Sequence, residues 1–307
     1  MQKKHTLQEF LADIAIKNAY QFKYLENSLA GITPEEVLKF ENLLNFYIQR
    51  ENNTLEGIVD MYLDMIFMMV EEQKYFIEYG KYRYSTFSEV ENYYRNSNYM
   101  SYYTIGLGLS VYLWRMHRSY SRLFDKALLL NNTTNRMGRY LEIGAGHGVY
   151  FSAAMQKSKY QKYTAVDISE TSVKLTQDYV RYSIPHCDKN YEVIHENIFI
   201  YQPSELFDMV VMGEVLEHVE NPNVFLRKIY ELASDNAIVF ITTAINAPQI
   251  DHIYQFGRME EVTDLIKREQ FEIIDFVAEN ANNMTLEKAE KRKVAINVGF
   301  ILKKVLS

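Results

Sequence analysis

One ten-residue stretch, Arg139–Gly148, constrains the fold of this chain more than any other segment. It reads Arg-Tyr-Leu-Glu-Ile-Gly-Ala-Gly-His-Gly, a short apolar run that contains a carboxylate and then turns through alternating glycines. Glycine has no Cβ, so it permits a sharp turn and lets the main chain lie close to a ligand. The pattern predicts a buried strand, a tight turn and the start of a helix, as in a doubly wound α/β sheet.

The residue types in this turn restrict the ligand that it could bind. Glu142 would repel a pyrophosphate, but it suits a cationic group such as the sulfonium and ammonium of S-adenosylmethionine. Gly144, Gly146 and Gly148 are spaced G-x-G-x-G, whereas dinucleotide sites carry G-x-G-x-x-G. No Lys-Ser/Thr pair follows, which disfavours a phosphate-binding P-loop.

More strand-like segments follow in order. Lys162–Asp167 is a second predicted strand, and Asp167 follows the glycine turn by about 20 residues, where such folds hold ribose hydroxyls with an acid. A helix is predicted from Arg258 to Glu269. The other predicted strands are Tyr191–His195, Phe207–Met212, Ala237–Thr243, Phe271–Ala278 and Val294–Leu302.

These segments together resemble the class I S-adenosylmethionine-dependent methyltransferases. The motifs YLEIGAGHG, AVDIS, ENIF and FDMVVMGEVLEHVENP carry the resemblance, which covers roughly residues 136–303. It is greatest to the small-molecule branch, which includes the ubiquinone-biosynthesis type. The resemblance implies an α/β fold with a Rossmann-like seven-stranded sheet, its last strand antiparallel, and S-adenosyl-L-methionine as cofactor. A dinucleotide-binding domain is the alternative, because it would share the acid and some of the glycines. Such a domain would not explain the EVLEHV segment after the fourth predicted strand.

The resemblance also implies roles for individual residues. Glu142 would lie near the methionine amino group, and the turn with Gly144, Ala145 and Gly146 would pass under the methionine half and the ribose. Asp167 would accept hydrogen bonds from both ribose hydroxyls. The remaining implied cofactor contacts are Ile168, Asn197, Ile198, Gly213 and Glu214. Asn197 stands where the family often has Asp beside the adenine amine.

Two histidines are candidates for a general base, because histidine titrates near neutrality. His218 follows the fourth predicted strand, and a structural hydrogen bond or a cofactor contact is the alternative role. His252 lies in the loop after the fifth strand, with Asn246, Asp251 and Tyr254 nearby, and such loops build the ligand crevice. The alternative is a loop that only packs. The spacing of these residues matches no strong metal motif, so no metal is predicted.

The first 130 residues have the apolar periodicity of helices. Thr33, Pro34 and Glu36 form a capping-box pattern at one helix start. The first predicted helix begins at Leu7 and ends at Gly31, with an apolar stripe that weakens around Asn18. The others begin at Thr33 or cover about Thr54–Tyr79, Phe87–Tyr94 and about Tyr99–Leu130. The polar segment 131–138 is the best linker, so we expect a helical region over 1–135 and a cofactor-binding domain over 136–307.

The resemblance implies that the helical region acts as a lid over the cofactor and contacts the substrate. Tyr94, Tyr99, Tyr102 and Tyr103 are the candidate contacts, since aromatic walls with polar tips suit a site that holds a cation. Ordinary helix packing is the alternative for each tyrosine. The apolar stretch Met61–Val70 could form a homodimer interface.

Composition excludes several partners. A net charge of −7 argues against nucleic acid, and no apolar run is long enough to span a bilayer. Cys187 is the only cysteine, and Glu9 and Asp13 interrupt the first apolar stretch, so we expect no signal peptide and a cytoplasmic protein.

The sequence therefore predicts methyl transfer to a small-molecule acceptor in metabolite or natural-product biosynthesis. Methylation of oxygen or nitrogen is favoured, and methylation of carbon is possible. The alternatives are a protein or RNA methyltransferase, or a non-catalytic partner that keeps this fold and acts through its N-terminal helices.

Overall fold

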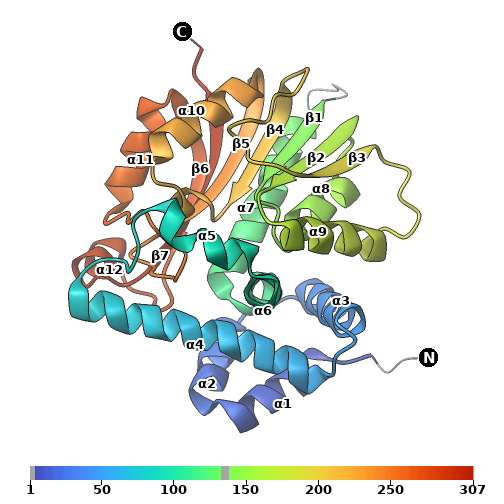
Figure 1. Ribbon diagram of the computed structural model, residues 1–307, viewed down its shortest axis with the longest axis vertical. Coiled ribbons are helices and arrows are strands. Elements are labelled where there is room, and N and C mark those ends of the chain that lie inside the picture. The colour runs from blue at the N-terminus through green and yellow to red at the C-terminus, as the bar shows by residue number, and fades with distance from the viewer. Residues whose placement is uncertain (1–3, 133–137, 307) are drawn as a thin grey trace.

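The computed structural model describes residues 4–132 and 138–306, and within these ranges seven strands form one sheet (Figure 1). The order across the sheet is β3-β2-β1-β4-β5-β7-β6. Strand β7 runs antiparallel to both of its neighbours, and the other pairs are parallel. The strands are β1 (Arg139–Ile143), β2 (Lys162–Asp167), β3 (Tyr191–His195), β4 (Phe207–Gly213), β5 (Ala233–Ile245), β6 (Phe271–Glu279) and β7 (Ile296–Lys304). The predicted α/β sheet with an antiparallel last strand is confirmed.

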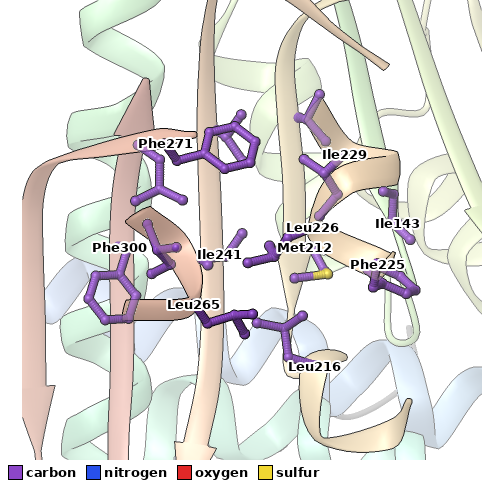
Figure 2. Packing of buried hydrophobic residues seen from close by; sticks show 14 of the residues in the cluster. Ile143, Met212, Leu216, Phe225, Leu226, Ile229, Ile241, Leu265, Phe271 and Phe300 are labelled. Carbon is purple, nitrogen blue, oxygen red and sulfur yellow. The ribbon is translucent and has the colours of Figure 1, made fainter. Parts of the chain in front are cut away.

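Helices cover both faces of this sheet (Figure 1). On one face lie α10 (Pro222–Leu232) and α11 (Met259–Arg268), and Figure 2 shows Leu226 and Leu265 from these helices against Met212 and Ile241 of the central strands. The opposite face packs against α7 (Arg115–Asn132), α8 (Val149–Lys157) and α9 (Glu170–Ser183). The alternation of side chains along each strand thus supplies two separate apolar cores.

The remaining helices gather at the end of the sheet where the parallel strands finish (Figure 1). They are α1 (Leu7–Lys17), α2 (Ala19–Ser28), α3 (Pro34–Arg50), α4 (Leu55–Tyr79), α5 (Phe87–Arg95) and α6 (Ser97–Leu113). Helices α5 and α6 lie between the long helix α4 and the sheet. A short helix, α12 (Leu286–Lys291), and one turn of 3-10 helix, η1 (Leu216–His218), complete the described elements.

Local signals in the sequence explain where these helices begin. The capping box at Thr33 is confirmed, since the amide of Glu36 donates to the Thr33 hydroxyl at 3.2 Å and Glu36 accepts from the Thr33 amide at 2.8 Å. The Thr54 hydroxyl caps α4 with a single bond, which it accepts from the amide of Gly57 at 3.1 Å. Each cap satisfies amides that the first helical turn leaves without a partner.

Two predicted helices are each broken in two. Asn18 ends α1 and caps α2, because its side chain accepts from the amide of Gln21 at 3.0 Å. Trp114 has an extended backbone, which separates α6 from α7, and its indole donates to the Tyr62 hydroxyl at 3.0 Å. The prediction of a single helix over Tyr99–Leu130 is therefore wrong. The chain leaves the helical conformation at Trp114, where the buried indole contacts Tyr62.

The proposed linker over 131–138 falls mostly outside the described residues. None of the helices in the described ranges combines the length and the apolar character that crossing a membrane requires.

Candidate active site

A cavity of about 850 Å³ lies where the ends of β1, β2, β4 and β5 meet the N-terminal helices. Its walls come from two regions that are far apart in the sequence. The sheet contributes the glycine turn after β1 and the residues that end the other strands, while α2, α4, α5, α6 and α7 contribute mainly apolar and aromatic side chains. The carboxyl end of a doubly wound sheet is where such folds bind ligands.

The glycine turn brings main chain rather than side chain to the cavity wall. Gly144 has φ of 69°, and a Cβ there would lie 2.9 Å from the Val215 side chain. Gly148 has φ of 73°, and a Cβ there would lie 2.9 Å from the backbone of Thr176 in α9. Both positions therefore require glycine, one for the turn beside the cavity and one for the packing of α8 on α9.

Two buried carboxylates flank this turn. Glu142 accepts a hydrogen bond of 2.5 Å from the Tyr140 hydroxyl, and burial raises the pKa of Glu142 to about 8. Asp167 accepts from the amides of Gly146 at 3.0 Å and Ser169 at 2.9 Å, one on each oxygen. Burial raises the pKa of Asp167 also. Each Asp167 oxygen keeps a lone pair with which it can accept a further hydrogen bond from a ligand.

A third carboxylate, Glu214, follows β4 with a strained backbone. Its φ of 52° is unusual for a residue other than glycine, and its amide donates to Thr242 through both the carbonyl and the hydroxyl oxygen. One oxygen of Glu214 is buried and has no hydrogen-bond partner among the described residues. Burial raises the pKa of this group, because the ionised form has lost its water.

The balance of charge in the cavity favours a cation. Six acidic residues line it, whereas no lysine or arginine does so in the part of the chain that the structure describes. A buried carboxylate without a partner is costly, and a positively charged ligand removes that cost. The residues present therefore fit S-adenosylmethionine, with its ammonium and sulfonium, better than they fit a phosphate-bearing cofactor.

Two histidines stand together on the same wall. The rings of His218 and His252 are 4.6 Å apart between centroids, in an edge-to-face arrangement. Nδ1 of His218 lies 3.1 Å from the carbonyl oxygen of Asp251 and 2.9 Å from the Tyr94 hydroxyl. Nδ1 of His252 lies 2.6 Å from the carbonyl oxygen of Ala247. Burial and the nearby His218 lower the pKa of His252 well below its ordinary value.

Most of the residues predicted for the site line this cavity. From the sheet they are Glu142, Gly144, Ala145, Gly146, Asp167, Ile168, Asn197, Ile198, Gly213 and Glu214. From the loops and helices they are His218, His252, Asp251, Tyr94 and Tyr103. The structure thus brings together both histidines and every position that the resemblance placed near the cofactor.

Four predicted residues lie elsewhere. Tyr99 stacks on Tyr103 behind the wall, and the Tyr102 hydroxyl donates to the sulfur of Met68 at 2.9 Å. Asn246 holds the loop after β5 by donating to the Gly257 carbonyl at 2.9 Å. Tyr254 packs on Phe256 with ring centroids 4.8 Å apart. These side chains serve packing and loop structure, which is the alternative that the sequence left open for the tyrosines and for the loop.

Other lining residues carry little signal in the sequence. His147 lies inside the glycine turn, and its Nδ1 accepts from the Val149 amide at 3.1 Å. Burial lowers the pKa of His147 to about 4. Tyr24 of α2 and Trp114 also reach the cavity. The position of His147 within the G-x-G-x-G turn could have predicted that it lies at the cavity. The positions of Tyr24 and Trp114 at the cavity depend on how the helices pack, which the sequence pattern does not give.

Comparison with known proteins places the chain in a family. Residues 112–280 match the model of the methyltransferase domain, which is more than half of the chain. The chain therefore belongs to this family, within the class I S-adenosylmethionine-dependent methyltransferases, and the predicted resemblance is confirmed at that level.

Its similarity to individual proteins is distant. The chain is 24% identical over 132 residues to the mitochondrial ubiquinone biosynthesis O-methyltransferase of Rattus norvegicus, covering 42% of this chain and 37% of that protein. It is 28% identical over 102 residues to (S)-coclaurine N-methyltransferase of Papaver somniferum, covering 33% of this chain and 28% of that protein. The matches thus span well under half the length of these curated relatives.

Among solved structures, an O-methyltransferase from a trans-AT PKS multienzyme of Brevibacillus brevis, in complex with S-adenosyl-L-homocysteine, is 14% identical with a TM-score of 0.46. The alignment covers 60% of this chain and 73% of that one.

Proposed function

We propose that this protein binds S-adenosyl-L-methionine and transfers its methyl group to a small-molecule acceptor. One observation carries the proposal: the strand-end acids and the glycine turn line the same cavity as apolar and aromatic side chains of the N-terminal helices. One wall suits a cationic cofactor, and the other leaves room for an apolar acceptor.

The bound cofactor supplies a methyl carbon made electrophilic by a positively charged sulfur. Glu142 and the turn from Gly144 to Gly146 bind its methionine half, and Asp167 accepts hydrogen bonds from the ribose hydroxyls. Ile168, Asn197 and Ile198 form the adenine pocket, while Gly213 and Glu214 face the ammonium group. These contacts hold and orient the cofactor, which is the main work of such an enzyme because the transfer needs alignment and exclusion of water.

The helical wall indicates the kind of acceptor. Tyr24, Met69, Phe87, Met100 and Trp114 line the cavity from the side of the N-terminal helices. Such a lining suits a molecule with an apolar or aromatic body and few charges. The O- and N-methyltransferases among the relatives support an oxygen or nitrogen nucleophile. We place this reaction in metabolite or natural-product biosynthesis.

Calorimetric titration with S-adenosylhomocysteine tests the proposal. We expect one-to-one binding by the wild-type protein and no binding of NADH, which serves as the control ligand. Asp167→Asn should weaken the affinity about 10- to 100-fold, because it replaces hydrogen bonds to a charged acceptor. Asp188→Asn, at an exposed acid, should bind like the wild type. A folded wild-type protein that does not bind S-adenosylhomocysteine would overturn the proposal.

A further inference from the structure

Three side chains on the histidine wall of the cavity come together as a set of metal ligands. They are Glu217, His218 and His252, each offering one ligand atom, and these atoms lie within 4.8 Å of one another. Glu217 and His252 are buried, with exposed fractions of 0% and 1%. Ligand atoms about 2 Å from one ion are about 3–4 Å apart, so the three atoms lie near the spacing that one ion requires.

The hydrogen bonds of the two histidines leave the correct nitrogens free. A carbonyl oxygen only accepts, so the contact to Ala247 places the proton of a neutral His252 on Nδ1. The contact to the Asp251 carbonyl favours the same tautomer for His218, with the Tyr94 hydroxyl as a second acceptor. Each Nε2 then carries a lone pair that can coordinate a metal ion. A histidine that donates through one nitrogen to a carbonyl and coordinates through the other is the usual arrangement around metals.

Glu217 supplies the second, independent observation. One of its oxygens accepts from the Thr243 hydroxyl at 2.7 Å, which fixes the side chain. The other oxygen is buried and has no hydrogen-bond partner among the described residues. A fixed carboxylate with one unsatisfied buried oxygen is costly unless a cation or a proton reaches it.

We propose that Glu217, His218 and His252 bind a divalent transition-metal ion in the wall of the cavity. Two imidazoles and one carboxylate form a donor set that suits Zn²⁺ and similar ions better than Mg²⁺, which prefers oxygen ligands. Three protein ligands leave a coordination position open, and His218 and His252 both line the cavity. The sequence brings His218 and His252 to attention as site residues, but their separation of 34 positions matches no strong metal motif, so it predicts no metal there.

Such an ion would give the two histidines a role in the reaction, and this step rests on the proposed function. An acceptor hydroxyl at the open position would lose its proton to solvent more easily, because a metal ion lowers the pKa of an oxygen bound to it. The oxygen electron pair then forms the bond to the methyl carbon, while the sulfur–carbon bond breaks and its electron pair stays on sulfur.

Metal binding can be measured without any methyl transfer. The full chain is stripped with a chelator and dialysed, and Zn²⁺ uptake is followed by elemental analysis and by competition with a chromophoric chelator. We expect one Zn²⁺ per chain, bound more tightly than Mg²⁺. His252→Asn keeps a donor toward the Ala247 carbonyl but removes Nε2, and Glu217→Gln keeps an acceptor for Thr243 but removes the charge. Each should weaken Zn²⁺ binding by at least about tenfold.

The controls separate this site from incidental binding and from misfolding. His186→Ala removes an exposed histidine beside Cys187 and should take up Zn²⁺ like the wild type. S-adenosylhomocysteine affinity and the unfolding temperature report whether each variant is folded. Equal Zn²⁺ affinity in the wild type, His252→Asn and Glu217→Gln, or no stoichiometric uptake by the wild type, would overturn the metal site. Neither result would affect the proposed cofactor, which the titration with S-adenosylhomocysteine tests separately.

Discussion

Glu142 shows how one buried carboxyl group makes the stability of the folded protein depend on pH. In the unfolded chain this carboxyl loses its proton near its ordinary pKa of 4.5, whereas in the folded protein it keeps the proton up to about pH 8. Between these values the folded state binds one proton more than the unfolded state. The free energy of unfolding contributed by this group therefore decreases as the pH rises through that window.

Glu142→Gln should remove this pH dependence, because the amide carries no charge and its oxygen still accepts from Tyr140. We expect the free energy of unfolding of the ligand-free variant to fall less than that of the wild type between about pH 5 and pH 8, by roughly 1–5 kcal/mol. Urea denaturation at both pH values measures the difference. Glu26→Gln, at an exposed acid of α2, should fall as steeply as the wild type. Parallel behaviour of Glu142→Gln and the wild type would contradict the raised pKa.

The site residues differ in how far the sequence could predict them. Glu142, Asp167 and Glu214 stand at or near the ends of strands, and the topology of a parallel sheet brings such ends to one edge, so their place at the cavity could be predicted. Tyr99 and Tyr103 lie one helical turn apart, yet only Tyr103 lines the cavity. Which face of a helix points toward the cavity depends on how that helix packs against other helices. A local sequence pattern does not contain this information.

Helix α6 depends on a glycine that lets other side chains approach closely. A Cβ at Gly108 would lie 2.0 Å from the Tyr47 hydroxyl and 3.1 Å from Cβ of His147. Tyr47 is fully buried in α3, so its ring cannot move aside without cost. Gly108 therefore allows α6 to pack against α3 and the glycine turn at the same time.

Gly108→Ala should destabilise the protein although alanine is the better helix former. We expect overpacking to outweigh the gain in helix propensity, with a net loss of about 1–2 kcal/mol in the free energy of unfolding. Gly57→Ala in α4 is the matched control, since a Cβ there meets only the side chain of Asn53, which is exposed and can turn away. That variant should be neutral or up to about 1 kcal/mol more stable. Equal effects in urea denaturation would show that Gly108 is not needed for close packing.

Among the elements, the strands were easier to predict than the helix breaks. Each predicted strand is present, because apolar β-branched runs bounded by turn residues are typical of strands. The predicted bounds were less accurate, since β5 extends beyond the predicted Ala237–Thr243 at both ends. The break at Trp114 has no Pro or Gly to mark it. It depends on the contact between the Trp114 indole and Tyr62 of α4, which forms only when the helices pack.

At the scale of the whole molecule, helices that precede β1 in the sequence pack their side chains into the same apolar clusters as the strands and helices of the sheet domain. Phe46 of α3 packs against Tyr179 of α9 with ring centroids 5.1 Å apart. Phe124 of α7 packs against Phe240 of β5 at 5.3 Å. The expected division near residue 135 would therefore cut through apolar clusters rather than between them. We propose that the helical region and the sheet fold as one unit.

A single cooperative transition in differential scanning calorimetry is the expected result, with the calorimetric enthalpy equal to the van't Hoff enthalpy. Phe46→Ala should lower the temperature of the whole transition, because removing a buried aromatic ring from a shared core costs about 3–5 kcal/mol. Ile16→Ala, at a side chain that is 84% exposed, should leave the transition unchanged. A chain of residues 136–307 should show no cooperative unfolding, since it lacks the α7 side chains that cover one face of the sheet. Two separate transitions, with Phe46→Ala shifting only one of them, would mean that the helices fold independently and that the cavity forms between two separately stable units.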